Sequence, residues 1–186
     1  MKKKRFLALM IDIIILLLIF KTISLLFVNP YQVELTTLSE KFINNEIGYS
    51  EFLYGYININ YYIAKNNVVI NIIQMVIMTI YFVLIPYINK GSTIGKMLFK
   101  IKVDKQDGKL KITDLLIRSF IINGNLYLLI LLILLPFVNS LLYFTIENIL
   151  GIMQIIVVII SGFMVLYKKD NLGLHDILTK TVVKER

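Results

Sequence analysis

Four long apolar segments constrain this chain more than any other feature of its sequence. A helix that crosses the hydrocarbon core of a bilayer needs about 20 mostly apolar residues, at about 1.5 Å each. Segments of that length occupy residues 6–28, 68–88, 119–142 and 146–167. The sequence therefore predicts an all-α integral membrane protein with four transmembrane helices.

The composition supports this class and excludes several others. Hydrophobic residues make up 58% of the 186 residues and charged residues only 17%, whereas soluble chains have about 45–50% and about 25%. The chain has no Cys and one His, which excludes disulfides, thiolate zinc sites and all-histidine metal sites. We expect no cofactor and no bound metal.

Basic residues predict the orientation in the membrane. The formal charge is +8, and Lys and Arg gather in residues 2–5, in the loop 89–118 and after residue 167. The segment 29–67 has two Lys against four Glu. Short cytoplasmic loops are enriched in Lys and Arg, so both termini and the loop 89–118 are predicted to be cytoplasmic in a plasma membrane. Basic residues between spans indicate topology rather than a nucleic-acid partner.

Two segments allow alternative interpretations. The N-terminus resembles a signal peptide, but no small-residue cleavage pattern follows its apolar run, so we expect a retained first span. The extracytoplasmic segment 29–67 is rich in Tyr and predicts one or two amphipathic helices. Its tyrosines are typical of residues that anchor a protein at the membrane interface, and a binding surface is the alternative.

The cytoplasmic loop contains two short alternating runs. Ile101–Val103 and Lys109–Ile112 flank Asp107-Gly108, a pattern that predicts a β-hairpin, and Thr113 is a candidate N-cap for the following helix. The segment from Gly91 through Thr93 and Gly95 to Lys96 lacks the spacing of a phosphate-binding loop. Anionic lipid headgroups are the expected partners of three basic residues here, Lys96, Lys100 and Lys102.

Charged residues within or beside the spans are the candidate functional residues. An ionisable group inside a bilayer is costly and usually faces a partner or water. Asp12 lies inside the first span, seven residues or about 10.5 Å from Arg5 along a helix, which is too far for direct contact. Arg118 and Asp176 lie near the same face of the membrane. We expect these charges to form one network.

These residues resemble the signature of the RDD family, which is named for one arginine and two aspartates. Arg5, Asp12 and Asp176 match those positions, and Gly91–Lys96 and Asp107–Arg118 are similar to the central pattern of the family. The resemblance covers nearly all of residues 1–186 and implies a single membrane domain. It also implies a proposed transport role, because cation/proton antiport is reported for some relatives. The fourth span and the long outer segment depart from the usual pattern.

Two functions remain open from the sequence. The protein could transport a cation or a proton through a site centred on Asp12, or it could be a membrane scaffold in which the charges are structural. The scaffold would bind a second copy or another membrane protein. Catalysis is not expected, because His175 and Asp176 are adjacent and would point about 100° apart on a helix.

Overall fold

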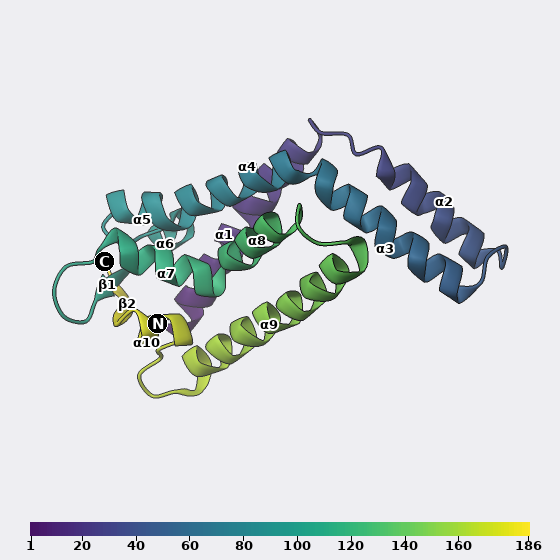
Figure 1. The fold of residues 1–186 in the computed structure, drawn as a ribbon. Helices are drawn as coiled ribbons and strands as arrows, with labels where there is room; N and C mark the ends of the chain where they lie inside the picture. Colours follow the sequence, from purple (N-terminus) through teal and green to yellow (C-terminus); the bar gives the residue numbers. More distant parts are fainter.

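The computed structural model describes all of residues 1–186, and long apolar helices connect its two ends (Figure 1). Three of these helices are long and apolar enough to cross a membrane: α1 (Lys2–Ser24), the continuous helix Val68–Ile88, and α9 (Ser140–Tyr167). A fourth is counted if α7 (Ile112–Ile122) and α8 (Asn125–Leu134) form one bent span. The prediction of an apolar helical membrane protein is confirmed at this level.

The helix Val68–Ile88 contains a turn of π-helix. It consists of α4 (Val68–Thr79), the π-helical η1 (Ile80–Leu84) and α5 (Ile85–Ile88). Pro86 has no N–H and cannot donate to the preceding turn, so the backbone is already irregular near this point. A π-turn changes the directions in which neighbouring side chains project from the helix, and such turns are frequent at functional sites. Here Tyr81 and Val83, which lie within η1, are buried.

The third apolar segment is not one straight helix over 119–142. Helices α7 and α8 meet at 74°, because Gly124 between them adopts a φ of +74° that only glycine takes readily. At one end of the pair, Asp114 forms an ion pair with Lys105. Just beyond the other end, the Leu135 carbonyl accepts a hydrogen bond from the Tyr61 hydroxyl (3.2 Å). The bent pair therefore connects the two ends of the molecule.

The outer segment forms two antiparallel helices, α2 (Tyr31–Ile43) and α3 (Tyr49–Asn66). This hairpin extends away from the other helices (Figure 1). Phe42 and Phe52 stack with ring centroids 4.4 Å apart. The Asn29 Nδ2 atom donates to Asn67 Oδ1 (2.9 Å), which joins the two ends of the hairpin.

The only sheet is formed by segments far apart in sequence. Strand β1 (Ile101–Lys105) pairs antiparallel with β2 (Thr181–Glu185), and Val103 lies opposite Val183. The predicted β-hairpin with Lys109–Ile112 is therefore wrong. Val183 packs with Val103, Ile101 and Ala8 in one buried cluster, and this burial outweighs the local turn at Asp107-Gly108. Two short helices, α6 (Ile94–Leu98) and α10 (Leu174–Leu178), lie at the same end of the molecule.

The predicted N-cap at Thr113 is also wrong. Helix α7 begins at Ile112, with Lys111 as its N-cap residue. The Asp114 carboxylate accepts a hydrogen bond from the Lys111 backbone N–H (3.0 Å). An acidic side chain in the third helical position satisfies this donor and interacts favourably with the helix dipole, so Asp114 rather than Thr113 stabilises the start of α7.

Single cysteines at Ser50 and Gln106 test the orientation. Ser50 lies at the start of α3 and Gln106 lies beside the sheet, at the opposite end of the molecule, and both are exposed. We expect an impermeant maleimide added to intact cells to label the Ser50→Cys variant only, and the Gln106→Cys variant to react only after the membrane is opened. Labelling of both from outside would contradict the predicted orientation. The chain has no native Cys, so the maleimide can label only the introduced residue.

Candidate functional site: two buried aspartates

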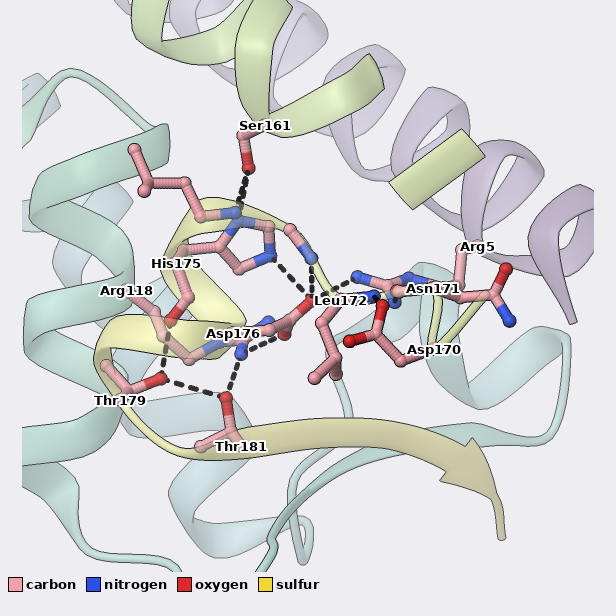
Figure 2. A network of polar contacts seen from close by, with 12 residues as sticks. Arg5, Arg118, Ser161, Asp170, Asn171, Leu172, His175, Asp176, Thr179 and Thr181 are labelled. Carbon is pink, nitrogen blue, oxygen red and sulfur yellow. Dashed lines mark hydrogen bonds and ion pairs between the residues drawn. The ribbon is translucent and has the colours of Figure 1, made fainter. Parts of the chain in front are cut away.

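Asp176 lies between two arginines that come from distant parts of the chain (Figure 2). Its Oδ2 atom accepts from Arg5 Nη2 of α1 at 2.7 Å, and its Oδ1 atom accepts from Arg118 Nη1 of α7 at 2.5 Å. The carboxylate is fully buried. A buried carboxylate with two guanidinium partners has its charge compensated, so these contacts tie α10 to α1 and α7.

Neighbouring polar groups complete this cluster, which we call the Asp176 cluster: Arg5, Arg118, Ser161, His175, Asp176 and Thr181. Asp176 also accepts from the Gly173 backbone N–H (2.9 Å) and so caps α10. Arg118 donates to the Thr181 hydroxyl at the start of β2. His175 Nδ1 lies 2.8 Å from Ser161 Oγ of α9. The cluster thus joins α1, α7, α9, α10 and β2.

The environment keeps Asp176 charged and His175 neutral. Burial opposes ionisation of Asp176, but the guanidinium groups of Arg118 and Arg5 hold its pKa below the usual range. Burial, followed by repulsion from Arg118, lowers the pKa of His175 to about 3 in spite of the attraction of Asp176. His175 is therefore a neutral hydrogen-bonding group at physiological pH.

The lowered pKa of His175 predicts a loss of stability in mild acid. An unfolded His takes up a proton below pH of about 6.5, whereas folded His175 stays neutral down to about pH 3. The unfolded state thus binds more protons between these values, and stability falls by up to about 1.4 kcal/mol per pH unit. We expect the melting temperature in detergent to fall from pH 7 to pH 4, and to fall less in His175→Gln. Equal pH profiles for both proteins would contradict this assignment.

Asp12 lies in a second cluster, which contains Asp12, Tyr81, Thr93 and Gly95. The Asp12 side chain is 1% exposed. Oδ1 accepts from the Tyr81 hydroxyl (2.6 Å) and from the Gly95 backbone N–H (2.8 Å), and Oδ2 accepts from the Thr93 hydroxyl (2.7 Å). All three donors are neutral, and no basic side chain forms an ion pair with Asp12. We call this group the Asp12 cluster.

The segment 91–96 is shaped to reach Asp12. Gly91 has a φ of +94°, and a Cβ atom there would lie 1.8 Å from the Val103 carbonyl oxygen. A Cβ atom at Gly95 would lie 2.3 Å from the Ala8 carbonyl oxygen of α1. Thr93 is the N-cap of α6, and its hydroxyl accepts from the Lys96 N–H (3.3 Å). Gly91 therefore allows the chain before α6 to pack on β1, and Gly95 allows α6 to pack directly on α1, which brings Thr93 and Gly95 to Asp12.

Lys96 is half-buried and forms no ion pair. Burial is the main cause that lowers its pKa to about 8; repulsion from Arg118 acts in the same direction, and the attraction of Asp12 opposes it. A lysine with this pKa exchanges its proton near physiological pH. Charged residues of both clusters influence this pKa: Asp12 in one, and Arg5, Arg118 and Asp176 in the other.

The structure separates residues that the sequence joined in one network. Arg5 and Asp176 are in contact, with Arg118 and His175 around them, whereas Asp12 contacts neither Arg5 nor Asp176. Tyr81 and Ser161 were missed, because a tyrosine or a serine in an apolar run carries no charge to signal its role. The π-turn that contains Tyr81 has no signature in the sequence.

Comparisons with known proteins identify one family. The family model described as "RDD family" matches residues 3–180, which is nearly the whole chain and includes Arg5, Asp12 and Asp176. No curated protein matches the chain significantly, and neither does any solved structure.

Proposed function

This chain belongs to the RDD family, and from that premise we propose that it moves a proton or a monovalent cation across the membrane through Asp12. In this proposal the protein is not an enzyme. Asp12 is the group that binds and releases the transported ion. The Asp176 cluster is a structural lock that holds the helix ends together around it.

The chemistry of the partners distinguishes the two aspartates and carries the proposal. Asp12 accepts from two hydroxyls and one amide, so it can take up a proton or a cation without breaking an ion pair. The hydroxyl oxygens of Tyr81 and Thr93 can turn to accept from a proton on Asp12 or to contact a cation. Asp176 is held by two arginines, and its protonation would leave both cations uncompensated.

Two neighbouring features support an exchange site at Asp12. Tyr81 belongs to the π-helical turn of the second long helix, and such turns are frequent at functional sites. Lys96 has a pKa of about 8, which the charge of Asp12 influences, so its amine exchanges a proton with water near neutral pH. Intramembrane carboxylates flanked by groups of this kind are typical of proton relays.

The proposed arrangement in the membrane follows from the basic residues. In it, both termini and the sheet face the cytoplasm of a cell, the α2–α3 hairpin faces outward, and α7 with α8 forms the third of four spans. A hollow of about 250 Å³ beside the sheet is lined by three lysines, Lys90, Lys102 and Lys109, and by Asp104, which forms an ion pair with Lys102. Lysines at this position support contact with anionic lipid headgroups, each worth about 1 kcal/mol.

Flux through purified protein in liposomes tests the proposal. We expect an imposed pH gradient to collapse faster with the wild type than with empty liposomes, in a way that depends on Na⁺, K⁺ or Li⁺. Asp12→Asn should abolish this flux, because an amide neither ionises nor binds a cation in the same way, while the variant remains folded. Asp107→Asn, at an exposed loop position, is the matched control and should transport normally.

A membrane scaffold is the second candidate, and one observation favours it. Both oxygens of Asp12 are hydrogen-bonded, so the carboxylate can also serve only to hold α6 on α1. A scaffold would show no flux with any of the three cations, and Asp12→Asn would lower the melting temperature instead. That pair of results would overturn the transport proposal.

A further inference from the structure

A second polar site lies at the opposite end of the molecule from the sheet. There, a partly open cavity of about 210 Å³ is lined by the end of α3, the start of α4, α8 and the first turns of α9. Its polar lining includes Asn60, Asn71, Tyr127, Tyr143 and Glu147. Neither Lys nor Arg lines it.

Glu147 gives this cavity one negative charge without a protein partner. It lies in the second turn of α9 and is half-buried, and it forms no ion pair and no side-chain hydrogen bond within the chain. Tyr143 is 5% exposed, and its hydroxyl also lacks a partner within the chain. Both residues line the cavity with their polar groups unpaired, so this end of the cavity is equipped to receive a ligand.

The remaining acceptors point to a cation. Asn60 uses its Nδ2 atom to donate to the Tyr56 carbonyl (2.8 Å), which leaves the Asn60 amide oxygen free to accept. The hydroxyl of Tyr127 has no partner within the chain, and phenol rings attract cations over their faces. A carboxylate, an amide oxygen and the faces of two tyrosines together favour positive charge, and no cationic side chain in the lining would hold an anion.

We infer that this cavity binds a small organic monocation, an ammonium group with short alkyl substituents. Six of the twelve lining residues are aliphatic, whereas a bare alkali ion needs oxygen ligands on all sides. The volume equals that of about seven water molecules at about 30 Å³ each, which is enough for a group of a few carbon atoms. Apolar walls at Ile63, Leu128 and Leu131 would contact the alkyl groups, and Glu147 would neutralise the charge.

This site is independent of the exchange proposed at Asp12. None of the residues of the Asp12 cluster lines the cavity. Ligand binding can therefore be measured without flux, and a protein that transports nothing can still bind an organic cation here.

The test uses tetramethylammonium as the probe and the full-length protein in detergent. We expect tetramethylammonium chloride to raise the melting temperature in a saturable way, and equal concentrations of NaCl, KCl or the neutral compound tert-butanol not to do so. Glu147→Gln should weaken the apparent affinity by about 10-fold or more, because a contact with a charged group is lost. Glu51→Gln, at an exposed position of α3, should bind like the wild type.

A second variant keeps the result decisive if Glu147→Gln does not fold. Leu128→Trp retains the carboxylate but fills the cavity, and it should abolish the shift. The inference is overturned if the wild type shows no saturable shift, if alkali salts give the same shift, or if the probe stabilises a folded Glu147→Gln or Leu128→Trp as it does the wild type.

Discussion

Asp176→Asn is expected to destabilise the protein by about 3–5 kcal/mol, because it leaves two buried arginines without a counter-charge. The carboxylate is fully buried and contacts both Arg5 and Arg118. An asparagine retains some hydrogen bonds but supplies no negative charge. Since the cluster joins α1, α7, α9, α10 and β2, its loss should loosen the whole end of the molecule that carries the sheet. Thermal unfolding in detergent, followed by tyrosine fluorescence, measures the effect.

The matched control is Asp107→Asn, which removes a carboxylate from an exposed loop. Surface substitutions of this kind usually change stability by about 0.5 kcal/mol or less. A melting temperature for Asp176→Asn equal to that of Asp107→Asn would show that the ion pairs of the Asp176 cluster contribute nothing to the stability of the fold.

The second large effect is expected for Gly95→Ala. A Cβ atom at this position would lie 2.3 Å from the Ala8 carbonyl oxygen and 2.7 Å from Asp12 Oδ1. Because the nearest atom is backbone, α6 must move away from α1, and Asp12 would lose the Gly95 N–H and weaken its bond to Thr93. Overpacking costs about 1–3 kcal/mol, and the loss of a hydrogen bond to a charged group costs about 1.5–3 kcal/mol more. We therefore expect a loss of about 3–5 kcal/mol together with any flux that depends on Asp12.

Gly162→Ala provides the comparison for this substitution. Gly162 lies on the exposed surface of α9, with nothing within 4 Å of the position of a Cβ atom. Alanine is the better helix former by about 1 kcal/mol, so Gly162→Ala should be neutral or slightly stabilising. If Gly95→Ala proved equally harmless, the close packing of α6 on α1 would be refuted.

The sequence predicted those features that depend on composition and on rare residues. The apolar segments identified the long helices, because each contains about 20 mostly apolar residues, which is the length of a helix that crosses a bilayer. Arg5, Asp12, Arg118 and Asp176 stood out because charge is costly beside a span. The contact between Arg5 and Asp176 follows the expected grouping of opposite charges at one end of the molecule.

Features that depend on contacts between distant segments could not be predicted in this way. The partner of β1 is β2, about 80 residues later, and the local turn at Gly108 favoured a hairpin instead. The partners of Asp12 depend on where α6 lies, which the close approach permitted by Gly95 decides. The position of Tyr81 depends on a π-turn that apolar periodicity does not reveal.

Infrared difference spectroscopy of the purified protein tests the exchange of ions at Asp12 most directly. Protonated and ionised carboxyl groups absorb at different frequencies, so a change at one side chain can be assigned with a variant. We expect a carboxyl signal that changes when Na⁺, K⁺ or Li⁺ is added, and that is absent from Asp12→Asn but present in Asp107→Asn. A spectrum in which Asp12→Asn and the wild type respond identically would contradict this expectation.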